Sequence, residues 1–165
     1  MPIPERTIIH VSGIPATGKS SFCRYLATIH GFAHYDMECF PRGWPHPDLY
    51  ATWSSSPQEF VRGLERHHKR SVIDWGFPIQ ARHIVDELQS AGVDLIWFTG
   101  DLQRARETFI ERGGIDVSLF DKQVAQIQGA RLPNGLGARV VNALGAMGGY
   151  LNGEDLIGNI FTDSI

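Results

Sequence analysis

The sequence has few cysteines and no long apolar run. Only two of its 165 residues are cysteine, Cys23 and Cys39, and their spacing matches neither a metal-binding pair nor a redox motif. No apolar stretch approaches the length of a membrane span, and residues 1–6 lack the apolar core of a signal peptide. We therefore expect a cytoplasmic protein without a membrane partner, in which Cys23 is part of a helix core.

The sequence also lacks an excess of either charge. Fifteen basic and 18 acidic side chains leave a net charge of −3, and no basic run stands out, which argues against a nucleic-acid partner. No repeat, low-complexity tract or linker interrupts the chain. Its length predicts one domain over residues 1–165, and leaves open whether the protein is a monomer or a homodimer.

The most specific feature is the stretch from Gly13 to Ser20, which reads Gly-Ile-Pro-Ala-Thr-Gly-Lys-Ser. This is the phosphate-binding loop pattern G-x-x-x-x-G-K-[ST]. β-Branched residues 7–12 before it predict a buried strand, and a helical apolar pattern after it ends at Gly31. A strand, a glycine loop and a helix are the context that the motif requires.

The residue types explain the chemistry of this loop. Gly13 and Gly18 lack the Cβ atoms that would hinder a tight bend next to an anion, and the following helix start adds partial positive charge. Lys19 supplies a point charge for the outer phosphates, and Ser20 supplies an oxygen ligand for Mg²⁺. The expected nucleotide-binding residues are Gly13, Ile14, Pro15, Ala16, Thr17, Gly18, Lys19, Ser20 and Ser21.

Acidic side chains follow two further apolar segments. Asp36 and Glu38 come after a short strand at 32–35, and Asp74 follows the apolar residues Val72 and Ile73. Ligands collect at the carboxyl ends of parallel strands. We therefore expect Asp36 to act as a general base and Asp74 to lie near Mg²⁺. Glu38 is either a member of the site or a solvated carboxylate.

A proline-rich segment at 41–56 predicts a loop that carries Trp44 and Trp53. These tryptophans either line an acceptor site or cover the edge of the core. The helix predicted after Ser56 ends in His67 and His68, which we interpret as compensation of the helix dipole rather than a metal site.

The remaining pattern alternates strands and helices. Strands are predicted at 93–99 and 139–144, a turn at 145–149, and helices at 80–90, 102–112, 117–127 and 153–161. Such alternation indicates parallel βαβ units with right-handed crossovers. The predicted fold is a three-layer α/β/α sandwich around a doubly wound, five-stranded parallel sheet.

The phosphate-binding loop, Asp36, the segment Val72 to Pro78 and the arginines after the fourth strand together resemble the P-loop small-molecule kinases. The similarity extends to the nucleotide- and shikimate-kinase-like proteins and to the zeta-toxin and polynucleotide-kinase-like ATPases of the P-loop NTPase fold. The resemblance implies strand order 2-3-1-4-5, ATP and Mg²⁺ as cofactors, an acceptor base at Asp36 and an arginine-bearing lid at about 104–131. Two features depart from it: Trp75 separates Asp74 from Gly76, where adenylate-type kinases have Asp-Gly-Phe-Pro, and Asp36 and Glu38 resemble the acid pair of shikimate kinases without an evident arginine set for that substrate.

These observations predict an ATP-dependent kinase that phosphorylates a hydroxyl group of an unidentified small-molecule acceptor. The alternative is a nucleotide-binding ATPase switch without such an acceptor. We expect Arg112, which precedes the glycine pair 113–114, to be the transition-state arginine, with Arg106 second and Arg104 a surface charge. If neither Arg112 nor Arg106 has this role, Arg131 is the next candidate.

Overall fold

The computed structural model describes residues 2–39, 41–144 and 149–162, and the predicted turn at 145–149 lies almost wholly outside them. Within these ranges the strands are β1 (Thr7–Gly13), β2 (Ala33–Asp36), β3 (Arg70–Asp74), β4 (Asp94–Thr99) and β5 (Arg139–Asn142). They form one sheet in the order β2-β3-β1-β4-β5, in which every neighbouring pair is parallel. The predicted strand order and fold class are confirmed.

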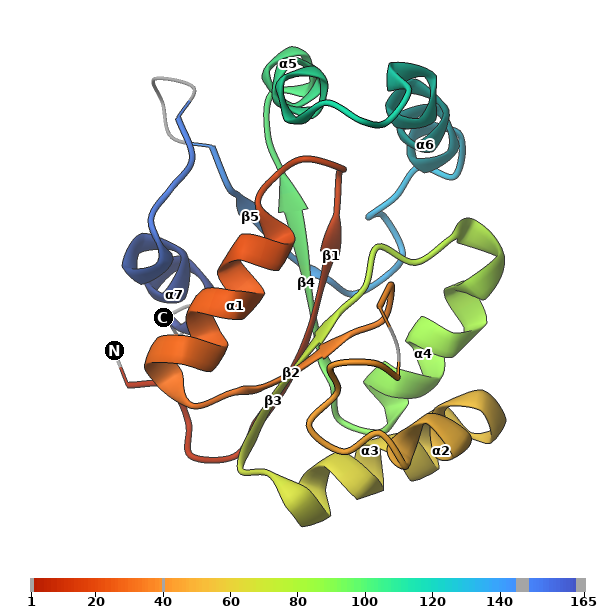
Figure 1. Ribbon diagram of the computed structural model, residues 1–165, viewed down its shortest axis with the longest axis vertical. Helices are drawn as coiled ribbons and strands as arrows, with labels where there is room; N and C mark the ends of the chain where they lie inside the picture. Colours follow the sequence, from red (N-terminus) through yellow and green to blue (C-terminus); the bar gives the residue numbers. More distant parts are fainter. Residues whose placement is uncertain (1, 40, 145–148, 163–165) are drawn as a thin grey trace.

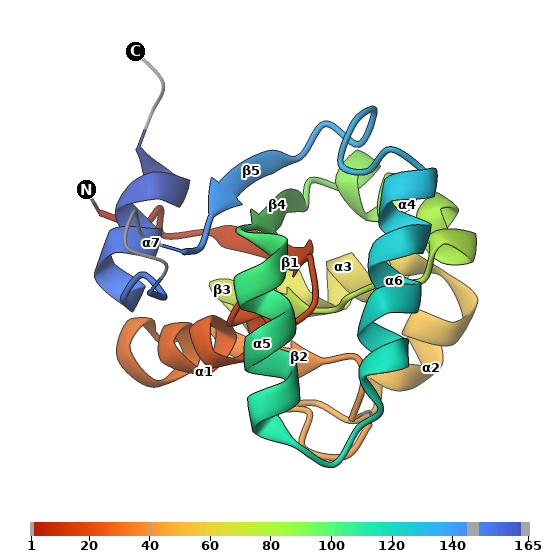
Figure 2. The same ribbon diagram turned by 90° about the horizontal axis from the view of Figure 1, so that it is seen from above.

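Helices cover both faces of this sheet (Figure 1). On one face lie α1 (Lys19–His30) and α7 (Gly153–Phe161), and on the other lie α2 (Leu49–Ser55), α3 (Pro57–His67) and α4 (Arg82–Ser90), the last preceded by the 3₁₀ turn η1 (Ile79–Ala81). Two further helices, α5 (Leu102–Arg112) and α6 (Val117–Gly129), lie across the end of the sheet where β1 and β4 finish (Figures 1 and 2). This is the end at which the phosphate-binding loop follows β1.

The alternation of apolar side chains along β1 builds the two core layers. Ile9 and Val11 pack with Phe22 and Leu26 of α1 and with the apolar side of α7. Ile8, which points to the opposite face, packs in a second cluster centred on Phe60 of α3. No helix in the described part of the chain is long and apolar enough to cross a membrane.

The structure differs from the sequence prediction in the segment 41–56, which contains the helix α2 rather than loop alone. The prolines of this segment stop at Pro47, so residues 48–55 are free to form a helix. Leu49 is buried and Trp53 is half-buried, one helical turn apart, and both pack in the cluster around Phe60. The apolar pattern of the helix after the phosphate-binding loop also predicts that Ile29 points inward, which is wrong, because this side chain is 60% exposed.

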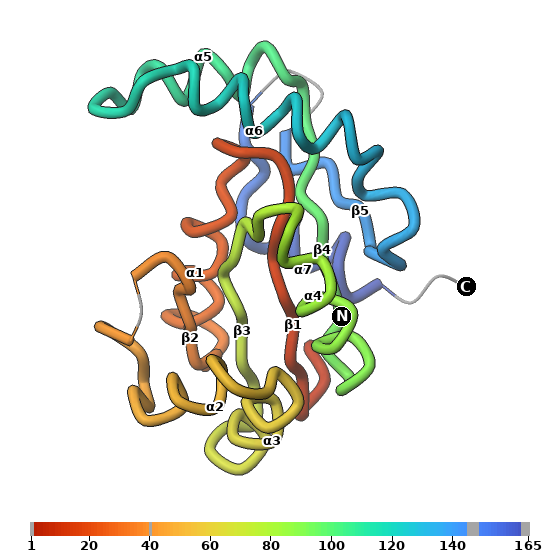
Figure 3. Tube along the Cα trace, turned by 90° about the vertical axis from the view of Figure 1, so that its right-hand side faces the viewer, coloured from red at the N-terminus to blue at the C-terminus, as the bar shows by residue number. Residues whose placement is uncertain are grey.

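The helices α5 and α6 form a hairpin held to the phosphate-binding loop. Ala105 and Phe120 pack against Ile14 and Ala16 of the loop. Figure 3 shows the two helices stacked over the end of β1, running side by side. The hairpin therefore covers the phosphate-binding loop.

Candidate functional site

The phosphate-binding loop adopts a backbone that depends on its glycines. Gly13 has φ 131° and Gly18 has φ 83°, and Ala16 at φ 59° is also left-handed. A Cβ atom at Gly13 would overlap the backbone of Phe98 on β4. Because β1 and β4 are adjacent, the loop can leave the sheet at this angle only with glycine in place.

Lys19 lies inside the curve of the loop. Its Nζ donates a hydrogen bond to the carbonyl oxygen of Ile14 at 2.7 Å, and the Thr17 hydroxyl donates to the same oxygen at 2.7 Å. Burial lowers the pKa of Lys19 to about 8, although the carboxylates of Asp74 and Glu38 act in the opposite direction. The ammonium is therefore still largely charged at neutral pH, and it is desolvated, which strengthens its attraction for phosphate.

Asp36 and Asp74 end adjacent strands and are paired in register. One Asp36 oxygen accepts a hydrogen bond from the Glu38 amide at 2.9 Å, and the Asp36 carbonyl accepts one from the Trp44 indole at 2.9 Å. Partial burial, together with the charges of Asp36 and Asp74, raises the pKa of Glu38. The parallel register therefore places three carboxylates at one end of the sheet, next to the phosphate-binding loop.

A cavity of about 660 Å³ extends from the phosphate-binding loop to the α6 helix. Asp74, Glu38 and Ser20 line it at the loop end, as do Lys19 and Arg112. Its far end is walled by the segment after β3 and by α6. The residues there are Gly76, Phe77, Pro78, Ile79, Trp97, Phe109, Ile115, Leu119, Gln123, Gln126, Ile127 and Leu132.

A second cavity of about 310 Å³ lies on the other side of the loop, towards α7. It is mainly apolar and includes Phe22, Tyr25, Tyr150 and Leu156. The Tyr150 hydroxyl donates a hydrogen bond to the Ala16 carbonyl, so this ring lies against the loop. Four residues line both cavities: Thr17, Gly18, Ser21 and Arg112.

The predicted arginines have different surroundings. Arg106 makes two hydrogen bonds to Asp121, at 2.9 and 3.1 Å, and so links α5 to α6. Arg104 lies 3.4 Å from Glu107 on the surface of α5. Arg112 lines both cavities and precedes Gly113 and Gly114, which have φ of 66° and 80°. Arg131 is exposed at the end of α6.

The two tryptophans of the 41–56 segment lie in the core. Trp44 is 4% exposed and packs edge-on against Tyr35, 5.1 Å between ring centroids. Trp53 packs against Phe60 and Trp75 at 5.2 Å. Neither residue lines the 660 Å³ cavity, whereas Glu38 does. Of the two roles left open for these tryptophans, the structure supports the packing role.

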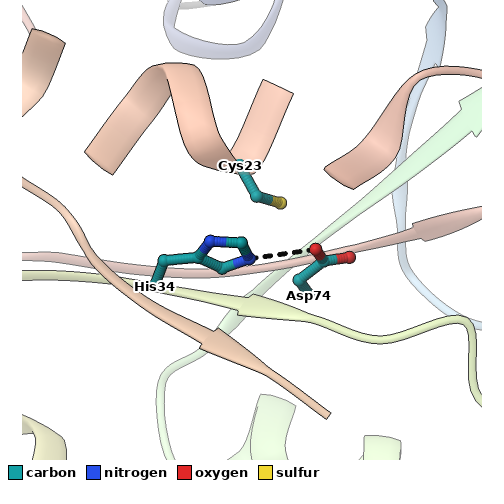
Figure 4. A group of neighbouring side chains, drawn as sticks. All are labelled: Cys23, His34 and Asp74. Atoms are coloured by element: carbon teal, nitrogen blue, oxygen red, sulfur yellow. Dashed lines mark hydrogen bonds and ion pairs between the residues drawn. The ribbon is translucent and has the colours of Figure 1, made fainter. Parts of the chain in front are cut away.

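Sequence reasoning missed two neighbours of Asp74. The Asp74 carboxylate lies 2.9 Å from His34 Nε2, and Cys23 is close to both (Figure 4). Side chains two residues apart in a strand lie on the same face, so His34 and Asp36 share one face of β2. This spacing was the available sequence signal that His34 lies near the site. The distance from His34 to Asp74 depends on the register of β2 against β3, which no local pattern specifies.

Comparison with known proteins supports the fold. No protein-family model matches the chain, and no curated protein matches it by sequence. Crystal structures with similar folds include a sugar kinase from Janibacter sp. HTCC2649, with TM-score 0.59, 19% identity and coverage of 83% of this chain and 85% of that one. A gluconokinase from Sinorhizobium meliloti 1021 matches with TM-score 0.53, 15% identity and coverage of 94% and 89%.

A third similar structure is a shikimate kinase from Bacteroides thetaiotaomicron, with TM-score 0.54, 13% identity and coverage of 83% and 86%. The similarity to all three extends over most of each chain. The protein therefore has the fold of P-loop small-molecule kinases.

Proposed function

We propose that this protein transfers the γ-phosphoryl group of Mg·ATP to a hydroxyl group of a small molecule. The arrangement of the two cavities supports this most directly. They flank the phosphate-binding loop and share Thr17, Gly18, Ser21 and Arg112. A nucleotide base in the smaller cavity would place its phosphates along the loop, and the larger cavity would then hold an acceptor beyond the terminal phosphate.

The residues at the junction suit a triphosphate. The loop amides and the Lys19 ammonium would bind the β- and γ-phosphates, and Arg112 would balance charge that develops during transfer. Ser20 and Asp74 both line the larger cavity with oxygen donors, the type that Mg²⁺ prefers. When bound there, Mg²⁺ would neutralise phosphate charge.

Two carboxylates are candidates for the general base. We propose Asp36 as the group that accepts the proton of the acceptor hydroxyl, because it ends β2 next to Asp74. Glu38 is the competing candidate, since it lies on the cavity wall and its raised pKa increases its basicity. If Asp36 is the base, Asp36→Asn should lower kcat strongly. If Glu38 is the base, Glu38→Gln should do so.

The acceptor cavity favours an uncharged molecule with an apolar body. Its cationic lining residues, among those described, are Lys19 and Arg24 of α1 and Arg112 at the end of α5, whereas α6 and the segment after β3 contribute none. The far wall combines aromatic and aliphatic side chains with two amides, Gln123 and Gln126. An anion at that end would therefore find no cationic partner among the described lining residues. We therefore propose an uncharged alcohol held by apolar contacts and by the two glutamines.

An ATPase switch remains the competing function. A switch would need the loop and Arg112 but no acceptor space, so the size and mixed lining of the larger cavity favour a kinase.

The experiment is a transfer assay with [γ-³²P]ATP against a panel of neutral and anionic alcohols. We expect label on neutral alcohols with apolar bodies, and loss of transfer in a folded Lys19→Met protein. Equal transfer by Lys19→Met would disprove the role of the loop. ATP hydrolysis that no panel alcohol alters would favour the switch.

A further inference from the structure

Three side chains from three elements meet beside the phosphate-binding loop. Cys23 of α1, His34 of β2 and Asp74 of β3 place their ligand atoms within 4.8 Å of one another (Figure 4). Cys23 is fully buried and Asp74 is 4% exposed, while the His34 side chain is 19% exposed. The cluster is thus enclosed on the helix side, and Asp74 also reaches the 660 Å³ cavity.

The donor types match a thiophilic cation rather than Mg²⁺. A thiolate, an imidazole nitrogen and a carboxylate oxygen are each ligands that Zn²⁺ accepts, whereas Mg²⁺ takes oxygen ligands. Zn²⁺ binds sulfur at about 2.3 Å and nitrogen or oxygen at about 2.0–2.2 Å, so tetrahedral ligand atoms lie roughly 3.3–3.7 Å apart. The 2.9 Å separation of His34 from Asp74 and the 4.8 Å limit of the cluster bracket this range.

The surrounding structure holds these donors in place. Cys23 is packed in the core between α1 and the sheet, and β2 and β3 are joined by a parallel ladder that runs from Ala33 to Asp36. Only side-chain adjustments are therefore needed to enclose an ion. A thiolate and a carboxylate would together neutralise the charge of Zn²⁺, and Asp74 is the one of the three ligands that also lines the 660 Å³ cavity.

We propose that Cys23, His34 and Asp74 form a binding site for Zn²⁺, and that Zn²⁺ bound there inhibits phosphoryl transfer. The inhibition follows because Zn²⁺ on the Asp74 carboxylate would neutralise its charge and so weaken its support of Mg²⁺. This second part rests on the proposed function, whereas zinc binding itself does not.

Binding is tested with Co²⁺, a spectroscopic substitute for Zn²⁺, titrated into untagged reduced protein. We expect one equivalent to bind with a thiolate-to-cobalt charge-transfer band, which Zn²⁺ then abolishes by displacement. Cys23→Ser should remove the band, and His34→Gln should weaken Co²⁺ affinity at least tenfold, because even outer-shell partners of metal ligands contribute about 10–100-fold. Cys23→Ala serves as a second variant in case serine disturbs folding, which circular dichroism checks.

Two controls separate this site from other binding. Cys39 is the other cysteine and is exposed, so Cys39→Ser should keep the band. The rings of His46 and His67 stack at 3.9 Å on the surface, and His67→Gln should not change the thiolate band. A cobalt spectrum without a thiolate band, or affinity unchanged in both Cys23→Ser and His34→Gln, would overturn the site.

Inhibition is measured as phosphoryl transfer at saturating Mg²⁺ with increasing Zn²⁺. We expect transfer to fall in the wild type at the zinc concentration that fills the site, and to persist in Cys23→Ser, whose activity without zinc should match the wild type. Zinc that binds without lowering transfer would refute the inhibition but not the site. A protein that phosphorylates no acceptor would refute the proposed function and leave the cobalt result intact.

Discussion

Asp36 and Asp74 occupy paired positions at the carboxyl ends of the adjacent parallel strands β2 and β3. They nevertheless have different partners. Asp74 lies against His34, while Asp36 accepts the Glu38 amide. The two carboxylates therefore have different surroundings, since Asp74 lines the larger cavity and Asp36 is not among its lining residues.

The first prediction separates the two candidate bases. Asp36→Asn keeps the side-chain size and the bond to the Glu38 amide but removes the base, so kcat should fall about 10²–10⁴-fold with little change in ATP affinity. Glu38→Gln should have a much smaller effect. Steady-state kinetics with the labelled acceptor and ATP binding by calorimetry measure both. The reverse ranking would make Glu38 the base.

The second prediction concerns the arginines of α5. Arg112→Ala should lower kcat by about 10³-fold, at the low end of the contribution of a transition-state arginine. It should weaken ATP binding only modestly, because the contact matters most as charge shifts. Arg112→Lys should restore kcat only partly, because lysine keeps the positive charge but lacks the planar guanidinium that can donate two hydrogen bonds to a phosphate. Rapid-quench single-turnover assays report the chemical step.

The other α5 arginines provide the controls. Arg104→Ala should have normal kcat, because this side chain lies on the surface of α5. Arg106→Ala breaks the pair with Asp121. It should therefore lower the melting temperature and leave kcat nearly unchanged. A large loss of kcat in Arg106→Ala alone would assign the catalytic charge to Arg106. Normal kcat in both Arg106→Ala and Arg112→Ala would leave Arg131 as the next candidate.

The third prediction tests the acceptor wall with two glutamines of one helix. Both side chains are exposed, but Gln126 lines the larger cavity, whereas Gln128 is not among the residues that line it. Gln126→Leu should raise the KM for the acceptor roughly 2- to 10-fold, the equivalent of one neutral hydrogen bond, and leave the KM for ATP unchanged. Gln128→Leu should change neither. Equal acceptor KM values in both variants would place the acceptor elsewhere.

The fourth prediction concerns the pH dependence of stability. His10 is buried on β1, and its Nε2 donates a hydrogen bond to the Trp75 carbonyl at 2.8 Å. Burial lowers the pKa of His10 to about 4 from 6.5. Between these values the unfolded chain binds the extra proton, so His10 contributes stability above pH 6.5 that is lost as the pH falls towards 4. The full difference is about 3 kcal/mol.

Urea unfolding at several pH values measures this effect. His10→Phe replaces the imidazole by a ring that does not titrate and suits the aromatic neighbours Trp75 and Phe77. The free energy of unfolding of this variant should depend less on pH between 4 and 6.5 than that of the wild type, whatever its absolute value. His83→Gln, at an exposed position on α4, should retain the wild-type slope. Parallel curves for His10→Phe and the wild type would contradict the prediction.

The sequence by itself determined the phosphate-binding loop and the alternation of strands and helices. The loop is readable because its requirements are local: glycines where the backbone is left-handed, and Lys19 and Ser20 at the start of α1. The caps of α3 and α6 are local in the same way, since the Ser56 side chain accepts from the Glu59 amide and Asp116 from the Ser118 amide. The strand order, by contrast, was predicted from the resemblance to P-loop small-molecule kinases, and the structure confirms it.

Only the tertiary structure decided which side chains meet. The approach of His34 and Cys23 to Asp74 requires the register of β2 against β3 and the packing of α1 on the sheet. The wall of the larger cavity likewise requires the α5–α6 hairpin to lie over the phosphate-binding loop, which brings Gln126 into the same cavity as Lys19. These contacts join residues far apart in the chain, and their distances follow from packing across the whole core, which neither periodicity nor a short motif encodes.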